Sequence, residues 1–174
     1  CTHYLTTTKE VLDNPDFNEA AKFVCSPALR DREDCEALWQ ALSDGLLTAV
    51  SSDHCGIDVA ELKQAGRNDF TQIPNGSPGA GDRLHMVWTE GVCTGKLTRQ
   101  KFVDVIATQP AKINGIYPRK GTLAVGSDAD VVIFDPNYEG TVHLADNPNG
   151  VDYNLYEGRR QSGRVETVLS RRPS

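Results

Sequence analysis

The most informative pattern in the chain is an apolar run that ends abruptly in polar residues. Residues 46–50 read Leu-Leu-Thr-Ala-Val, and residues 51–54 read Ser-Ser-Asp-His. A short apolar run of this kind is typical of a strand that is buried on both faces. In α/β enzymes with parallel strands, functional groups collect where the strands end. The pattern therefore predicts a buried strand that presents the Asp53 carboxylate and the His54 imidazole at its C-terminal end.

Two more strands and a helix are predicted before this run. β-branched and aromatic residues favour a strand over Thr2–Thr8, and Lys22–Ser26 is a second short apolar run that stops before Pro27. A helix is expected after Asp31, which can serve as its N-cap, and Gly45 is expected to end it. One face of this helix is apolar: Cys35, Leu38, Trp39 and Leu42. The order strand, helix, buried strand predicts a βαβ unit, and hence a parallel sheet.

The rest of the chain predicts a long loop, then helices, then short strands. Glycine and proline are frequent over residues 66–81, which predicts an irregular loop, and loops of this length are commonly functional. Helices are expected from about Asp82 and after Thr98, which is a good N-cap. Beyond Lys120 the pattern predicts short strands at residues 121–126, 129–135, 141–144 and 165–169. A domain boundary is expected near Tyr117, with an α/β domain over 1–118 and an all-β domain over 119–174.

Composition excludes several classes of partner. The 174 residues carry a net charge of −6 without a block of Lys or Arg, which argues against nucleic acid and against an anionic membrane surface. No apolar run approaches the ~18 residues that a membrane-spanning helix needs.

The five cysteines are odd in number and widely spaced, so neither a disulfide framework nor a structural zinc site is indicated, and reduced thiols in a cytoplasmic protein are expected. The chain begins at Cys1 inside a strand-like stretch, which predicts that it is a segment of a longer protein.

Three residues could carry chemistry, and each has a structural alternative. Asp53 could serve a catalytic site or could cap the turn that follows it. Ser26 could bind a ligand or could only terminate its strand. Asn75 lies in a Pro-Asn-Gly turn, where asparagine tolerates left-handed backbone angles. The four histidines show no metal-ligand spacing, so the residues by themselves support an α/β domain with a possible carboxylate site.

Seven motifs are distributed over nearly the whole chain. They are Cys1-Thr-His-Tyr-Leu5, Val24-Cys-Ser-Pro-Ala-Leu-Arg30, Ser52-Asp-His-Cys55, Ile73-Pro-Asn-Gly-Ser-Pro-Gly79, Gln109-Pro-Ala-Lys-Ile113, Lys120-Gly-Thr-Leu-Ala-Val-Gly-Ser-Asp-Ala-Asp-Val-Val-Ile133 and Asp152-Tyr-Asn-Leu-Tyr-Glu-Gly158. In this order they resemble the C-terminal portion of the dihydropyrimidinases and D-hydantoinases, a family of cyclic amidohydrolases. The resemblance implies the C-terminal part of a (β/α)₈ TIM-like barrel together with part of a small β-sandwich.

The resemblance also implies roles for the three candidate residues. Asp53 matches an aspartate that ligates one of two metal ions, usually zinc, and that acts as general base and then as proton donor to the departing amide nitrogen. Ser26 and Asn75 match residues that hold the imide ring of the substrate, largely through main-chain groups. The implied reaction opens a dihydropyrimidine or a 5-substituted hydantoin to an N-carbamoyl amino acid.

The family's remaining metal ligands, four histidines and a carboxylated lysine, are expected N-terminal to this chain. The isolated 174 residues are therefore expected to be inactive and poorly stable, and the family suggests a homotetramer. Two alternatives stay open: a non-enzymatic relative that acts in assembly or binds the cytoskeleton, and a related cyclic amidase such as allantoinase or dihydroorotase. The Asp53 carboxylate favours an enzyme, since a scaffold does not require it.

Overall fold

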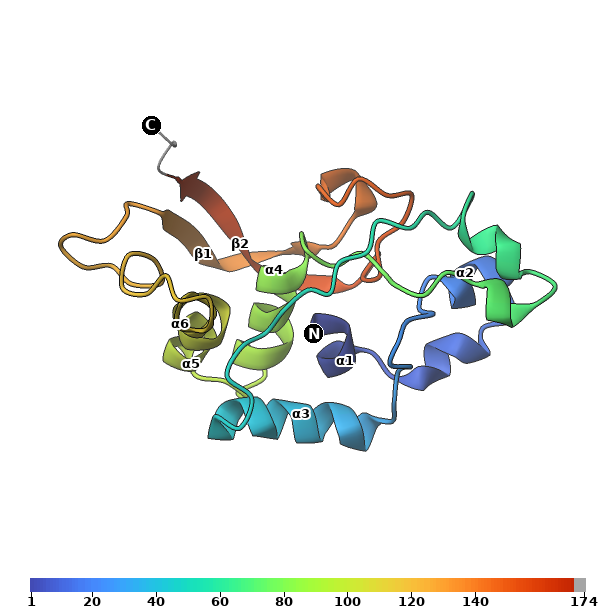
Figure 1. Ribbon diagram of the computed structural model, residues 1–174, viewed down its shortest axis with the longest axis horizontal. Coiled ribbons are helices and arrows are strands. Elements are labelled where there is room, and N and C mark those ends of the chain that lie inside the picture. Colours follow the sequence, from blue (N-terminus) through green and yellow to red (C-terminus); the bar gives the residue numbers. More distant parts are fainter. Residues whose placement is uncertain (171–174) are drawn as a thin grey trace. The chain divides into compact units, whose positions relative to one another are not determined.

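The computed structural model describes residues 1–170 (Figure 1). The chain divides into two compact units, each built from three stretches of sequence. The first unit comprises Cys1–Leu38, Ser51–Arg83 and Thr141–Arg159. Within the described residues, the second unit comprises Trp39–Val50, Leu84–Gly140 and residues 160–170. The last four residues of the predicted second domain, 119–174, lie outside the described part of the chain.

The first unit is assembled from short helices joined by irregular segments. Its helical elements are α1 (Thr2–Thr6), η1 (Lys9–Asp13), α2 (Phe17–Ala21), η2 (Lys63–Gly66), η3 (Phe70–Gln72) and η6 (Leu144–Asp146). The strand predicted over Thr2–Thr8 is wrong, because residues 2–6 form α1. The Thr6 hydroxyl donates to the Thr2 carbonyl oxygen at 2.9 Å, so the hydroxyl group of Thr6 is satisfied within the helix. Burial of this segment overrides its intrinsic preference for a strand.

Helix α3 (Arg32–Asp44) confirms the helix that was predicted from its ends. The Asp31 carbonyl accepts the amide of Cys35, and the Asp31 amide donates to the Asp34 carboxylate at 3.3 Å, so both groups complete the first turn. Gly45 follows the last helical residue with φ +82°, the left-handed conformation that glycine adopts without a Cβ penalty. On the predicted apolar face, Cys35, Trp39 and Leu42 are each 2% exposed, and Leu38 is half-buried.

The buried strand predicted over residues 46–52 is not formed. Leu46 is 80% exposed and only Val50 is buried, where its amide donates to the Val105 carbonyl oxygen at 3.1 Å. The strand predicted over Lys22–Ser26 is also absent, since residues 22 and 23 continue from α2 as a turn. Strands require hydrogen-bonded neighbours. Among residues 1–170 the parallel pairing is limited to an isolated bridge between His54 and Ser77, so the predicted βαβ sheet is not present there.

The second unit contains a helical stretch and a two-stranded sheet (Figure 1). Its helical elements are α4 (Arg83–Val87), η4 (Trp88–Val92), α5 (Arg99–Val103), η5 (Asp104–Thr108) and α6 (Gln109–Ile113). Thr98 caps α5 as predicted, because its side chain accepts the amide of Lys101 at 3.1 Å.

The sheet pairs β1 (Val131–Thr141) with β2 (Arg160–Leu169). These strands contain the predicted strand segments 129–135 and 165–169 in large part, whereas the strand predicted over 121–126 is replaced by turns and bends. The predicted strand 141–144 is reduced to the end of β1.

An aromatic cluster packs the helical stretch against β1. The ring of Trp88 lies 5.2 Å from that of Phe102 and 4.9 Å from that of Phe134, both in edge-on geometry. Gly163 on β2, with φ +74°, lies against this cluster, since a Cβ there would come within 2.8 Å of the Phe134 and Trp88 rings. The described residues thus form an α/β piece, as predicted, in which helices predominate. None of their helices has the length and apolar character needed to cross a membrane.

Candidate functional site

Asp53 occupies an unusual backbone position in the first unit. Its φ of +52° makes it the one non-glycine residue with positive φ among residues 1–170. Left-handed angles are uncommon for residues other than glycine, although aspartate tolerates them better than most, and they concentrate at functional sites. The side chain is exposed, and within the described part of the chain no hydrogen bond or ion pair engages its carboxylate. The carboxylate is therefore available to a ligand.

The charge of Asp53 acts on groups of α1 and of the segment before Ser26. Burial raises the pKa of Tyr4 and of Cys25, and the negative charge of Asp53 raises both further. Burial lowers the pKa of His3 to about 4, against the opposing effect of Asp53, so this imidazole is neutral at pH 7. The Asp53 carboxylate is thus in electrostatic reach of α1 and of the chain that leads to Ser26.

Ser26 and Asn75 lie together, as the sequence predicted of a shared site. The Ser26 hydroxyl donates to Oδ1 of Asn75 at 3.1 Å, and both residues are exposed. Their backbones are tied as well, because the amide of Gly76 donates to the Val24 carbonyl oxygen at 3.0 Å. The Tyr4 hydroxyl donates to the Pro27 carbonyl oxygen at 2.6 Å and so fixes the other side of Ser26. The site thus has one firmly held edge.

The loop that carries Asp53 is tied to the loop that carries Asn75. The amide of Cys55 donates to the Ser77 carbonyl oxygen at 3.0 Å, and the amide of Gly79 donates to Nδ1 of His54 at 3.3 Å. The Ser77 hydroxyl in turn donates to the Lys22 carbonyl oxygen at 2.8 Å. These bonds connect the loops around residues 53 and 75 with the segment that precedes Ser26. The three residues predicted from sequence therefore belong to one hydrogen-bonded assembly.

Two residues beneath this assembly were not predicted. Tyr4 lies in the segment for which the sequence predicts a strand, and Lys63 lies in a polar stretch that is typical of a surface. Lys63 is 0% exposed, and its Nζ donates to the carbonyl oxygens of Ala21 and Val24. No sequence signal marks Lys63, because its partners are main-chain oxygens about 40 residues away.

The described residues do not make up a metal centre. Nowhere in residues 1–170 do three or more His, Cys, Asp or Glu side chains group in a way that could hold an ion. Asp53 alone supplies one carboxylate, which is too few ligands to hold a zinc ion against water.

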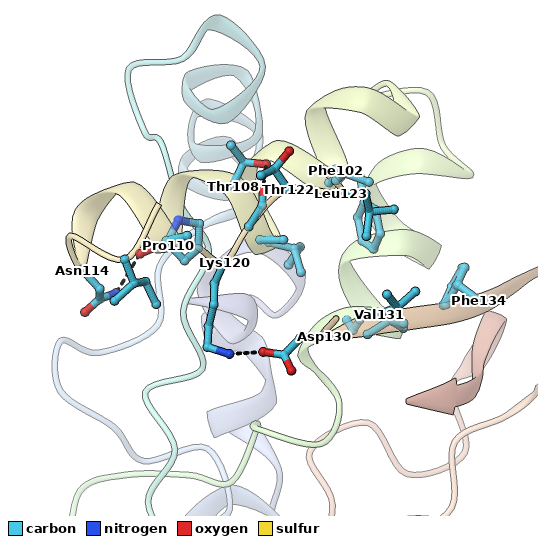
Figure 2. Close-up of a pocket in the computed structure, with 18 residues that line it drawn as sticks. Phe102, Thr108, Pro110, Asn114, Lys120, Thr122, Leu123, Asp130, Val131 and Phe134 are labelled. Atoms are coloured by element: carbon cyan, nitrogen blue, oxygen red, sulfur yellow. Dashed lines mark hydrogen bonds and ion pairs between the residues drawn. The ribbon is translucent and has the colours of Figure 1, made fainter. Parts of the chain in front are cut away.

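A hollow in the second unit has a different character (Figure 2). Its volume is about 730 Å³, and its lining is mostly aliphatic and aromatic, with Phe102, Val131 and Phe134 among the residues drawn. Lys120 pairs with Asp130 at its edge. Lys120 also pairs with Asp128, at 3.2 Å, so the charged groups at this hollow are engaged with one another, unlike the Asp53 carboxylate of the first unit.

The comparisons with known proteins define the class. The sequence matches the amidohydrolase family over residues 1–170, and the chain belongs to this family. It is 48% identical over 171 residues to a D-hydantoinase of Ralstonia pickettii, and 44% identical to a D-hydantoinase of Geobacillus stearothermophilus. Each match covers 98% of this chain but only 37% and 36% of the relative.

Solved structures lead to the same branch of the family. The dihydropyrimidinase of Brevibacillus agri superimposes with a TM-score of 0.95 at 46% identity, covering 98% of this chain and 37% of that one. An L-hydantoinase (dihydropyrimidinase) of Arthrobacter aurescens gives a TM-score of 0.82 at 33% identity. The resemblance to dihydropyrimidinases and D-hydantoinases is therefore confirmed, and the chain spans little more than a third of the length of these relatives.

Proposed function

We propose that this chain is part of a longer enzyme that hydrolyses cyclic amides, opening dihydropyrimidines or 5-substituted hydantoins to N-carbamoyl amino acids. The observation that carries the proposal is the 48% identity to a named D-hydantoinase over 98% of the chain. The site supports it, since an unpaired carboxylate at Asp53 lies in an assembly that also holds Ser26 and Asn75.

In this reaction Asp53 is the group that moves the proton. The carboxylate accepts a proton as the oxygen of water adds to the ring carbonyl carbon, and it returns the proton to the ring nitrogen as the C–N bond breaks. Its exposed position supports this role, because a substrate and a water molecule can reach the carboxylate.

Ser26 and Asn75 are proposed to hold the substrate ring. An imide ring alternates N–H and C=O groups, and main-chain groups at a held edge offer the complementary donors and acceptors. The bonds from Tyr4 to Pro27 and from Gly76 to Val24 support this role, since they fix the backbone on both sides of Ser26. A fixed edge loses little entropy when the ring binds.

The family suggests an architecture for the whole enzyme. We propose that residues 1–118 contribute to a (β/α)₈ barrel and that 119–174 contribute to a β-sandwich. The family suggests a metal cofactor, which we propose is zinc, with Asp53 as its ligand from this chain and the other ligands supplied by residues outside it. We further propose a cytoplasmic homotetramer, and we expect the isolated 174 residues to be inactive because their site is incomplete.

Two measurements test the proposal. The coding sequence upstream of Cys1 should specify a His-x-His motif and a lysine at a strand end, which the metal site requires. The complete protein should release N-carbamoyl products from hydantoin or dihydrouracil and should contain bound metal by elemental analysis. A complete protein that lacks these ligands and hydrolyses neither ring would instead support the non-enzymatic assembly role.

A further inference from the structure

Lys63 is an ammonium group placed entirely inside the first unit. Its side chain is 0% exposed, and its hydrogen-bond partners in the described chain are the carbonyl oxygens of Ala21, at 2.7 Å, and Val24, at 3.2 Å. Buried lysines are rare unless they are paired, because removing the charge from water is costly. A pair of carbonyl oxygens compensates part of that cost, and burial still lowers the pKa of Lys63 to about 8. A costly arrangement of this kind indicates that the amine has a specific task.

The two carbonyl groups lie where the chain leaves α2 and turns toward Ser26. Ala21 is the last residue of α2, and carbonyl groups at a helix end lack partners within the helix and carry partial negative charge. Val24 lies two residues before Ser26, and its carbonyl oxygen also accepts the amide of Gly76. The Val24 carbonyl oxygen therefore bonds both the Lys63 amine and the turn that carries Asn75, and it lies on the segment that leads to Ser26.

We infer that Lys63 is a positioning residue for substrate binding: by holding the Ala21 and Val24 carbonyl groups, it fixes the backbone that presents Ser26 opposite Asn75. This inference rests on the proposed function, since it assigns Lys63 to the ring-binding edge of that same site. Lys63 itself does not touch the substrate, because its amine lies beneath the backbone. The proton-transfer group, Asp53, belongs to another loop, so Lys63 should govern binding far more than turnover.

Steady-state kinetics of the complete enzyme on hydantoin test this inference. Lys63→Met keeps the length and apolar stem of the side chain and removes its donors. We expect KM to rise at least tenfold while kcat stays within threefold of wild type. Lys63→Arg, which retains donors and charge, should give a KM between the two. Lys9→Met is the matched control, because the exposed Lys9 amine pairs with exposed Asp31 at 2.7 Å and bonds none of these carbonyl groups.

Each outcome is decisive. A Lys63→Met enzyme whose KM stays within twofold of wild type, or whose kcat falls as much as its KM rises, would overturn the inference. If circular dichroism shows that neither Lys63 variant folds, Lys63 has a purely structural role and the inference is also overturned. An inactive wild-type enzyme would overturn the proposed function and this inference together, which distinguishes that failure from a failure of Lys63 alone.

Discussion

The Ser26 hydroxyl donates a hydrogen bond to Oδ1 of Asn75 at 3.1 Å, although 49 positions separate these residues in sequence. Beneath this bond the backbone amide of Gly76 is bonded to the Val24 carbonyl oxygen. Two loops that are distant in sequence thus form one edge through both side-chain and main-chain contacts. If this edge binds the substrate ring, its main chain matters more than its side chains.

Ser26→Ala should therefore have a small effect on binding. The substitution removes one exposed hydrogen bond, which contributes about 1 kcal/mol or less, and leaves the backbone in place. We expect KM on hydantoin to change by less than about threefold. Gly76→Ala provides the contrast, because its Cβ would lie 2.7 Å from Sγ of Cys55 at a φ of +134°, and the turn must move. KM should rise at least tenfold in that variant, and equal effects of the two substitutions would contradict main-chain recognition.

Asp82 should be a major determinant of stability in the first unit. Its carboxylate is 1% exposed and accepts hydrogen bonds from the side-chain amides of Asn147, Asn149 and Asn154, at 2.7 to 3.1 Å. Asp82→Ala leaves these amides without that acceptor and should lower the free energy of unfolding by about 3 kcal/mol. Chemical denaturation of the complete protein measures this, with exposed Asp146→Ala expected to change stability by less than about 0.5 kcal/mol. Equal effects of the two variants would show that the amide network contributes little.

Gly163→Ala should disrupt the aromatic cluster of the second unit. A Cβ at this position would lie 2.5 Å from the Phe134 ring and 2.8 Å from the Trp88 ring, at a φ of +74°. Overpacking and left-handed strain together should cost about 3 kcal/mol. Gly95→Ala is the matched control, since φ is +80° there but nothing lies within 4 Å, so only the backbone cost of about 1 kcal/mol remains. Thermal unfolding midpoints should therefore fall further for Gly163→Ala, and equal shifts would contradict close packing at the cluster.

The buried amine of Lys63 predicts a specific dependence of stability on pH. Its pKa is lowered by burial to about 8, below the ordinary value of 10.5, so between these values the unfolded chain holds a proton that the folded chain has released. Stability linked to Lys63 therefore rises as pH increases through this window. The free energy of unfolding of wild type, measured relative to that of Lys63→Met, should therefore increase by about 1–2 kcal/mol from pH 7.5 to pH 10. A difference that does not change with pH would show that the amine is not desolvated.

Local signals predicted α3 and the start of α5 well. The helix between Asp31 and Gly45 and the cap at Thr98 depend on residues within a few positions of each other, and these interactions form wherever the segment lies. The strands predicted over Thr2–Thr8 and Leu46–Ser52 failed for the opposite reason. A strand depends on hydrogen-bonded neighbours, and the described chain does not supply them for these segments.

The candidate site was predicted in part. Asp53, Ser26 and Asn75 were marked by an abrupt change from apolar to polar residues or by turn chemistry, and the structure ties their segments together. Their catalytic and binding roles remain predictions. Lys63 could not be predicted, because its burial depends on carbonyl groups from a distant segment rather than on any feature of its own sequence.

The central claim is that Asp53 transfers the proton in cyclic-amide hydrolysis, and Asp53→Asn in the complete enzyme tests it most directly. The substitution keeps the shape of an exposed side chain and removes its basicity, so the fold should persist and kcat on hydantoin should fall at least about a thousandfold. Asp13→Asn, at the exposed C-terminal end of η1, should leave kcat unchanged. An Asp53→Asn enzyme that turns over hydantoin at a rate close to wild type would contradict the account.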